Sequence, residues 1–405
     1  MESAKLMPIS CFIDSLEEMK AMKGECPTWA WRADLHRILC MQGGDDDGSY
    51  AKNSEAPASA ITLSKPLLIQ AIHSMKLFHH EPSLRIADLG CATGYNTLAT
   101  IDLVVDALRS RYTQLDHCTT MPEFEAFFSD LPSNDFNSLF RSLPSFQDSK
   151  KKHYYAAGVP GSFYHRLFPK AKLHMAVSLS ALHWLSQIPE AVLDHGSPAW
   201  NKGRAWIDGA NKEVVEAYAK QSEEDLINFL RCRREEIVEG GVLFILMAGR
   251  RGSQQPENQL GDPDSRAKHP FTSSMDQAWE DLLNEGLIDE EVRDTFNIPA
   301  YMRSTNEVNA AFEQCKGFEI QTLEYQRIVE HSREKQEEWI KDPTSYGRSK
   351  ANLVRATLKP IVEAHLGPKL SEELFKRFER RASSDLGMLH KTCFYGVIVV
   401  SAIRK

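Results

Sequence analysis

The chain lacks any long apolar run. No stretch approaches the roughly 20 apolar residues that a membrane-spanning helix needs, so we expect no contact with a membrane. The apolar patch near the amino end, from Met7 to Ile13, is interrupted by Pro8 and Ser10. A secretory signal peptide is therefore not expected.

The chain also lacks a pattern among its eight cysteines. They stand at positions 11, 26, 40, 91, 118, 232, 315 and 393, without CxxC pairs or zinc-finger spacing. This usage favours reduced thiols in a cytoplasmic protein over a disulfide framework or a zinc site. Histidines and acids paired at metal-ligand spacing are missing as well, so the sequence predicts no metal site and gives metal-dependent hydrolysis no support.

The chain also lacks an excess of positive charge. The 48 Lys and Arg residues against 56 Asp and Glu residues give a formal net charge of -8, which argues against nucleic acid as a partner. What is present is the composition of an ordinary globular protein, 42% apolar and 26% charged. A chain of 405 residues can bury a large core and usually holds more than one structural unit.

Apolar segments of strand length alternate with segments of helix length. The predicted strands are Leu84–Asp88, Phe124–Ser129, Leu173–Ser178, Val242–Met247, Ile320–Tyr325 and Phe394–Ser401. Helices are predicted between the first four strands, among them Thr97–Leu108 and Val214–Val238. This alternation predicts an α/β fold with a parallel sheet and right-handed crossovers. Val242–Met247 is continuously apolar, as expected of a strand buried on both faces.

Two charged, helix-rich stretches interrupt the alternation. They are residues 251–316, which contain four prolines, and residues 331–391. We expect them to form a helical cap over the carboxyl ends of the strands, where open α/β sheets bind ligands. The sheet domain would then comprise residues 37–250, 317–330 and 392–405, with residues 1–36 as an N-terminal extension of unassigned role.

Residues 86–96, IADLGCATGYN, form the most informative segment. A strand-like run ends in an acidic turn and opens a helix, and Gly90 and Gly94 allow the backbone to turn sharply and to approach a ligand closely. A dinucleotide site would instead show G-x-G-x-x-G followed by a distant acid. An acid within the strand favours S-adenosylmethionine, which offers an α-amino group in place of a phosphate. The alternative is an ordinary strand-to-helix turn.

Further motifs follow this segment in a specific order. They are MxGG at 41–44, SYAxNS at 49–54, SDLPxNDFN at 129–137, GVPGSFY at 158–164, HWLSQ at 183–187, NKG at 201–203, LRCR at 230–233, GRR at 249–251 and FNIPxY at 296–301. Through these motifs the chain resembles the SABATH carboxyl methyltransferases, a family best known from plants and with fungal relatives, from about residue 37 to the carboxyl end.

The resemblance has consequences for the fold, the cofactor and the assembly. It implies a Rossmann-like class I methyltransferase fold, in which a seven-stranded, mostly parallel sheet with flanking helices carries an inserted α-helical cap. It also implies S-adenosyl-L-methionine as cofactor, S-adenosyl-L-homocysteine as product, a small-molecule carboxylic acid as substrate, and a homodimer.

The cofactor residues that the resemblance implies are Tyr50, Ser54, Asp88, Gly90, Asn96, Asp130, Leu131, Ser162 and Phe163. Asp88 and Asn96 would face the methionine part, and Asp130 would hold the ribose hydroxyls. Ser162 and Phe163 would take the adenine, while Tyr50 and Ser54 close the site. The alternatives are a helix-capping acid for Asp88, a turn residue for Asp130 and core packing for Phe163.

The substrate residues that the resemblance implies are Ser180, His183, Trp184, Tyr301 and Phe394. A carboxylic acid is already ionised at neutral pH, so no general base is needed and no catalytic acid or base is predicted. The indole N–H of Trp184 can donate to one carboxylate oxygen and leave the other free to attack the methyl group. Core packing is the alternative for Trp184, and His183 is either a second donor or a core histidine.

Several residues depart from the salicylate-type pattern. A glutamine that helps to bind the carboxylate is replaced by Pro57, and a tyrosine four residues before Trp184 is replaced by Ser180. These changes predict a wider and more polar pocket. Basic residues of the cap could meet a second carboxylate, namely Arg250, Lys268, His269 and Arg303. A non-aromatic or dicarboxylic acid, or an acyl amino acid, is therefore one substrate hypothesis, as in a fungal-type member.

Two other activities stay open at the level of the sequence. An N-methyltransferase of the xanthine-alkaloid type would share His183 and Trp184. A nicotinamide-dependent oxidoreductase would share the sheet but would need a third glycine in the cofactor turn.

Overall fold

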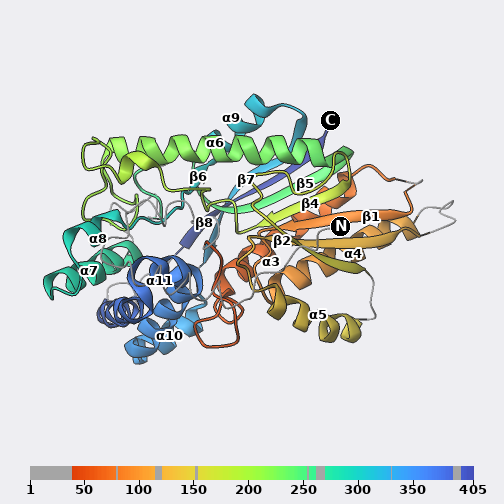
Figure 1. Ribbon diagram of the computed structural model, residues 1–405. Coiled ribbons are helices and arrows are strands. Elements are labelled where there is room, and N and C mark those ends of the chain that lie inside the picture. The colour runs from red at the N-terminus through yellow and green to blue at the C-terminus, as the bar shows by residue number, and fades with distance from the viewer. Residues whose placement is uncertain are drawn as a thin grey trace, which may run out of the picture.

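A single twisted sheet forms the centre of the protein (Figure 1). The structure is a computed structural model that describes residues 39–78, 81–114, 121–150, 154–252, 255–260, 270–329, 331–385 and 394–405, with the backbone alone for 145–150, 270, 271 and 394. The predicted extension, residues 1–36, lies outside these ranges. The strands are β1 (Ser83–Leu89), β2 (Glu123–Asp130), β3 (Tyr155–Pro160), β4 (Leu173–Leu179), β5 (Ile237–Arg250), β6 (Arg303–Ser304), β7 (Phe318–Val329) and β8 (Phe394–Arg404).

The strand order along the sheet is β3-β2-β1-β4-β5-β8-β7, and β6 pairs with β5 off this path. The pairs from β3 to β5 are parallel, whereas β8 runs antiparallel to both of its neighbours. The mostly parallel sheet is therefore confirmed. The described strands number eight rather than seven, because β6 pairs with the end of β5 at Gly249. A Cβ at that glycine would lie 2.8 Å from the Arg303 carbonyl oxygen, so only glycine allows this approach.

All six predicted strands are present, but β3 and β6 were not predicted. Strand β3 lies at the edge of the sheet, and its residues are small or largely exposed. It therefore shows neither a continuous apolar run nor a clear alternation. Strand β6 has only two residues, which is too short for any periodic signal.

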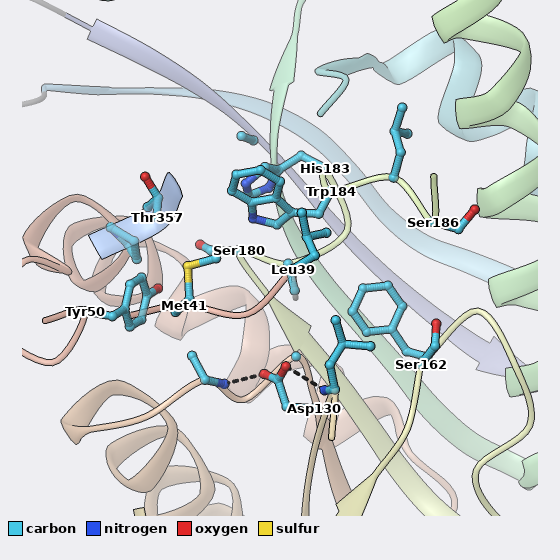
Figure 2. Close-up of a pocket in the computed structure, with 18 of the residues that line it drawn as sticks. Leu39, Met41, Tyr50, Asp130, Ser162, Ser180, His183, Trp184, Ser186 and Thr357 are labelled. Atoms are coloured by element: carbon cyan, nitrogen blue, oxygen red, sulfur yellow. Dashed lines mark hydrogen bonds between the residues drawn. The ribbon is translucent and has the colours of Figure 1, made fainter. Parts of the chain in front are cut away.

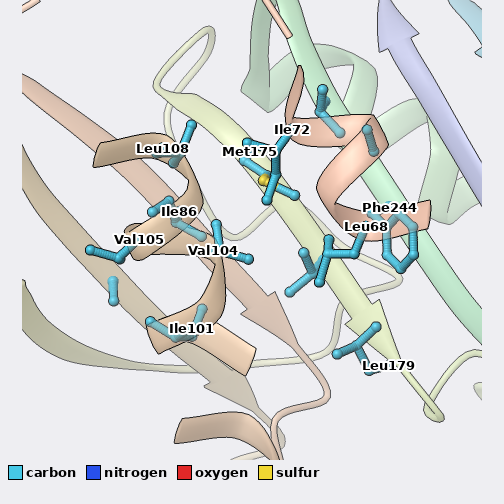
Figure 3. Close-up of a cluster of buried hydrophobic side chains, with 14 of the residues drawn as sticks. Leu68, Ile72, Ile86, Ile101, Val104, Val105, Leu108, Met175, Leu179 and Phe244 are labelled. Carbon is cyan, nitrogen blue, oxygen red and sulfur yellow. The ribbon is translucent and has the colours of Figure 1, made fainter. Parts of the chain in front are cut away.

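Helices cover both faces of the sheet. One face carries α3 (Glu55–Ser74), α4 (Tyr95–Thr113) and α5 (Phe136–Lys150), and the other carries α6 (Lys212–Glu236) and α9 (Thr305–Cys315) (Figure 1). Phe244 of β5 packs toward α3 and α4, together with Leu68 and Ile72 (Figure 3). Its neighbour Leu243 packs on the opposite face, with Phe229 of α6. Burial on both faces explains the continuous apolar run of β5.

The remaining helices gather beyond the carboxyl ends of the parallel strands. They are η2 (Glu190–Val192), α7 (Pro270–Asn284), α8 (Glu290–Thr295), α10 (Arg333–Lys341) and α11 (Pro343–Ser384). Trp279 and Phe296 stack at 4.6 Å in a core that also includes Phe375. Helix α9 falls within the range predicted for the cap but packs on α6 and β7. The division into two domains stays an interpretation.

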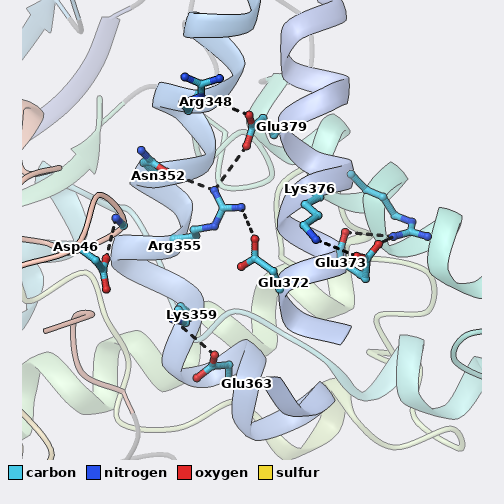
Figure 4. A network of polar contacts seen from close by, with 12 residues as sticks. Asp46, Arg348, Asn352, Arg355, Lys359, Glu363, Glu372, Glu373, Lys376 and Glu379 are labelled. Atoms are coloured by element: carbon cyan, nitrogen blue, oxygen red, sulfur yellow. Dashed lines mark hydrogen bonds and ion pairs between the residues drawn. The ribbon is translucent and has the colours of Figure 1, made fainter. Parts of the chain in front are cut away.

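Helix α11 is a hairpin of two arms that meet at Gly367, where φ is +74°. Gly347 brings the arms together, because a Cβ there would clash with Ser383. Arg355 of the first arm lies 3.0 Å from Glu372 and 3.7 Å from Glu379 of the second arm (Figure 4). The two arms are thus held together, and Thr357 of the first arm lines the pocket described next.

Candidate active site

A pocket opens at the carboxyl ends of β1, β2 and β4 (Figure 2). This is the edge at which open α/β sheets bind ligands. Nine of the predicted site residues line it: Tyr50, Gly90, Asp130, Leu131, Ser162, Phe163, Ser180, His183 and Trp184. Twelve further residues of the described ranges line it: Leu39, Met41, Pro57, Ala92, Tyr164, Ala181, Leu185, Ser186, Ala248, Thr357, Tyr395 and Val397.

Gly90 shapes the floor of the pocket. Its φ is +81°, a conformation that side chains disfavour, and a Cβ there would clash with Ala181 and lie 3.3 Å from Phe163. Ala92 and Ser180 also have positive φ, at +48° and +59°, although neither is a glycine. Such conformations concentrate where function constrains the backbone, and both residues line the pocket.

Asp130 ends β2 and faces the glycine turn. Its Oδ2 accepts a hydrogen bond from the Ala92 N–H at 2.7 Å, and its Oδ1 accepts one from the Leu131 N–H at 2.8 Å (Figure 2). Burial raises the pKa of Asp130 to about 6, although these two bonds oppose the rise. Each oxygen keeps a second lone pair for a ligand hydroxyl.

Asp88 is the penultimate residue of β1, two residues before Gly90, and is 2% exposed. Its Oδ2 accepts from the Thr97 hydroxyl at 2.5 Å, whereas its buried Oδ1 has no hydrogen-bond partner among the described residues. Burial raises the pKa of Asp88 to about 7, the Thr97 bond opposes the rise, and the charge of Asp130 adds to it. A buried carboxylate oxygen without a partner fits a cationic donor.

Residues 39–54 form a cover that touches the cap and the sheet domain. The Gln42 N–H donates to the Ala356 carbonyl of α11 at 2.8 Å, and the Gly44 N–H donates to Asp135 before α5 at 3.1 Å. At the end of the cover, the Asn96 amide donates to the Ser54 hydroxyl at 3.1 Å. Those two predicted residues therefore bind each other, and neither is among the lining residues.

Ser162 and Phe163 lie in a loop that a buried ion pair of α6 holds in place. Arg233 donates to the Phe163 carbonyl at 2.8 Å, and Glu236 accepts from the Leu167 N–H at 2.6 Å. The two charged side chains are 2.7 Å apart and fully buried. Because both charges are satisfied by each other and by loop backbone, the position of the Phe163 ring is strongly determined.

His183 and Trp184 lie in the loop after β4, with ring centroids 5.5 Å apart (Figure 2). Burial, with a contribution from the charge of Arg303, lowers the pKa of His183 to about 4. Its imidazole is therefore neutral at pH 7. The buried His183 Nδ1 has no hydrogen-bond partner among the described residues.

Two further predicted residues, Asp88 and Tyr301, are not among the described lining residues. Tyr301 is 1% exposed, and its hydroxyl donates to Glu307 at 2.6 Å and accepts from Arg250 at 3.0 Å. Its backbone N–H donates to the His183 carbonyl at 2.9 Å. The side chain of Phe394 lies outside the described residues. Tyr395 of the same strand lines the pocket instead and was not predicted.

Two of the basic residues expected to meet a second carboxylate, Arg250 and Arg303, have other partners. Arg250 pairs with Glu307 at 2.7 Å, and Arg303 donates to the backbone carbonyls of Leu182 and Ser222. Lys268 and His269 lie outside the described residues. Among the lining residues that the structure describes, none is a lysine or an arginine.

The described residues offer neither a metal-binding cluster nor a membrane-spanning helix. Within the described ranges, no group of three or more His, Cys, Asp or Glu side chains could hold a metal ion. None of the described helices is long and apolar enough to cross a membrane.

Comparisons with known proteins identify relatives of almost the whole chain. A family model described as "SAM dependent carboxyl methyltransferase" matches residues 36–405. The chain is 61% identical to gibberellic acid methyltransferase 2 of Arabidopsis thaliana over 91% of this chain and 95% of that protein. It is 56% identical to gibberellic acid methyltransferase 1 of the same plant, over 91% and 98%. A solved structure of loganic acid methyltransferase with SAH superposes with a TM-score of 0.77 at 32% identity, covering 90% of this chain and 98% of the other.

Proposed function

This chain belongs to the family of S-adenosylmethionine-dependent carboxyl methyltransferases, and we propose that its pocket methylates the carboxylate of a bulky, non-aromatic acid of the gibberellin type. The observation that carries the proposal is a pocket in which Asp130 lies with the neutral groups around Trp184, while the buried Asp88, on the adjacent strand, keeps an unpartnered oxygen among the described residues. The membership leaves the nicotinamide oxidoreductase without support, and it favours a carboxylate over a ring nitrogen as the methyl acceptor.

Asp88 and Asp130 are the residues that we propose hold the polar groups of the cofactor. The unpartnered Oδ1 of Asp88 suits the α-amino group, because a charge-assisted hydrogen bond contributes about 1.5 to 3 kcal/mol. Asp130 suits the ribose hydroxyls, since its carboxylate lies at the wall with lone pairs to spare. Gly90 and Leu131 would contact the cofactor beside them.

Phe163 and Ser162 are proposed to form the adenine site. The Phe163 ring offers an apolar face, and the Ser162 hydroxyl offers a donor and an acceptor at the same wall. The cover bearing Tyr50 lies over the pocket, with Ser54 and Asn96 fixing its end. Such a cover would exclude water from the reacting groups.

Bound S-adenosylmethionine supplies an electrophilic methyl group on a sulfonium. The acid arrives ionised, so the pocket has no proton to remove and needs only to bind, orient and dehydrate the carboxylate. Trp184 is proposed to donate its indole N–H to one carboxylate oxygen. Neutral His183 and the Ser180 hydroxyl are the nearby candidates for a second donor, since Pro57 supplies none.

Neutral donors suit this reaction better than a cation would. Methyl transfer converts an anion into a neutral ester, so charge on the carboxylate falls as the reaction proceeds. A buried arginine would stabilise the reactant more than the transition state and would slow the step. The described wall around Trp184 carries no such cation.

The substrate proposal rests on the relatives and on the shape of the wall. The two relatives above 55% identity are named for gibberellic acid, whose carboxyl group sits on a fused, non-aromatic ring skeleton. Pro57 and Ser180 replace larger polar or aromatic side chains, which leaves room for such a skeleton. Arg250 and Arg303 are engaged elsewhere, so a diacid gains no support from them.

Mass spectrometry of the products tests the proposal directly. The protein is incubated with S-adenosylmethionine and a panel of gibberellic acid, indole-3-acetate, salicylate and an aliphatic diacid. We expect a base-labile methyl ester of gibberellic acid as the main product. Methylation confined to the aromatic acids or to the diacid, or a base-stable N-methyl product, would contradict it.

The assembly and location stay predictions. A homodimer and a cytoplasmic location are what the sequence leads us to propose. Light scattering on the purified protein would test the first, and imaging of a tagged chain the second.

A further inference from the structure

The loop that carries His183 and Trp184 has no regular secondary structure, yet six of its residues are tied to other elements. The tied residues and their partners are Ser180 to Leu246, Leu182 to Arg303, His183 to Tyr301, Trp184 to Tyr164, Leu185 to Pro299 and Ser186 to Asp225. Four of these ties are made by backbone or uncharged groups. The other two come from charged side chains, Arg303 and Asp225.

The hydrogen bonds of Arg303 are made by a fully buried side chain. It is 1% exposed, and its guanidinium donates to the Leu182 carbonyl and, at 2.8 Å, to the Ser222 carbonyl of α6. One rigid fork therefore joins the residue just before His183 to the helix behind the loop. Gly249 permits this placement, since it lets β6 lie close against β5.

Asp225 of α6 binds the other end of the loop, at Ser186. Its two oxygens accept from the Ser186 N–H at 2.8 Å and the Ser186 hydroxyl at 2.6 Å. Burial raises the pKa of Asp225, and the hydrogen bonds from Ser186 and the positive charge of Arg303 oppose this rise, so the two charges lie near enough to interact. Both ends of the loop are thereby fixed to α6.

We infer that Arg303 is a positioning residue for the carboxylate-binding loop, acting on Trp184 and His183 through the Leu182 carbonyl. The inference rests on the proposed carboxylate site. Arg303 is absent from the described pocket wall, so it does not touch the acid. Its role is to hold the donor groups in line for transfer, where a displacement of about 1 Å can cost a hundredfold in rate.

The test is Arg303→Met, which keeps the volume and removes both hydrogen bonds. We expect kcat/KM for the acid to fall by about ten- to a hundredfold, with a raised KM. The dissociation constant of S-adenosylhomocysteine, measured by calorimetry, should stay within about twofold of wild type, because the cofactor walls are untouched. Arg303→Lys keeps one donor and should recover part of the loss, since an ammonium lacks the rigid fork that serves two carbonyls.

Arg293→Met is the matched control. Arg293 of α8 is also 1% exposed, donates to a carbonyl, that of Gly203, and lies 3.6 Å from Asp276, but it is remote from the pocket wall. Its loss should lower the melting temperature while KM stays at the wild-type value. The Arg303 variant must differ from this control in KM.

The outcomes separate this inference from the proposed function. A wild-type protein that forms no ester overturns the proposed function. An active wild type, with Arg303→Met showing only the lower stability of the control, overturns the positioning role. Where Arg303→Met does not fold, Arg303→Lys decides: a KM raised at least threefold supports the role, and a wild-type KM overturns it.

Discussion

The proposed site has an acidic side, with Asp130 at the pocket wall and Asp88 on the adjacent strand, and a neutral side, at His183 and Trp184. On the acidic side both carboxyls are buried, and their pKa values rise to about 7 and about 6. On the neutral side burial acts on a base and lowers the pKa of His183 to about 4. The same physical cause disfavours the charged form on both sides: near pH 7 His183 is neutral and Asp88 is partly protonated, whereas Asp130 stays mostly ionised.

The difference explains how one site can bind both a cationic group of the cofactor and the anionic carboxylate of the substrate. A cationic group brought to Asp88 restores the carboxylate to its charged form, so binding and ionisation favour each other. An anion brought to Trp184 meets neutral donors only, so it is held without being strongly stabilised. We expect the acidic side to control affinity for the cofactor and the neutral side to control turnover.

Trp184→Ala should have the largest effect. Removing the proposed carboxylate donor should lower kcat/KM for the acid by about 100- to 1000-fold, as loss of one well-placed donor does in other transfer sites. Affinity for S-adenosylhomocysteine should stay nearly intact in calorimetry. Trp200→Ala, at a partly buried tryptophan stacked on His195, is the control. Loss of cofactor binding in Trp184→Ala would instead indicate a core role. It would contradict the assignment of cofactor affinity to the acidic side and turnover to the neutral side.

Asp88→Ala should act on the other side. Loss of the charge-assisted contact should weaken S-adenosylhomocysteine binding at least tenfold, which corresponds to about 1.4 kcal/mol. The KM for the acid should change little at saturating cofactor. Calorimetry on the purified variant measures the first quantity and steady-state kinetics the second. An unchanged dissociation constant would remove Asp88 from the cofactor site.

The pH dependence of the free protein sharpens the same comparison. Because the pKa of Asp88 is about 7 in the folded chain and near 3.9 when unfolded, the folded state binds the extra proton between these values. Stability should therefore fall as pH rises from about 4 to 7, and cofactor affinity should rise over the upper part of that window. Asp130 contributes in the same direction, with its pKa at about 6.

Asp88→Asn isolates this contribution. The variant cannot ionise, so its unliganded form should be more stable than wild type at pH 8 in urea unfolding. Its cofactor affinity should vary less between pH 5.5 and 8. A wild-type protein whose affinity is flat over this range would show that Asp88 is already charged before the ligand arrives.

The sequence revealed the acidic side more fully than the neutral side. Asp88 ends one predicted strand and Asp130 directly follows another, so strand pattern and motif together located them. Tyr301 lies in an equally clear motif, but its hydroxyl donates to Glu307. This contact between a loop and helix α9 could not be predicted from the periodicity of the sequence.

The residues that the sequence missed come from segments distant in the chain. Leu39, Thr357 and Tyr395 meet only after the cover, α11 and β8 have packed together. Arg303 looked like a solvated or substrate-facing cation, because a buried arginine becomes visible only once the carbonyls that receive it are in place. Long-range packing, rather than local pattern, decided these positions.

Pro57→Gln should have the smallest effect and the most specific one. Pro57 lies at the pocket wall in the first turn of α3, where salicylate-type relatives are expected to carry a glutamine. A glutamine would add a neutral donor near Trp184, worth about 0.5 to 1.5 kcal/mol, or roughly a two- to tenfold gain in affinity. The gain should favour small flat acids such as salicylate over a bulky one, because the longer side chain also fills space. Competition between the two acids in one reaction measures this ratio, and a gain for the bulky acid would show that Pro57 does not limit the width of the neutral side.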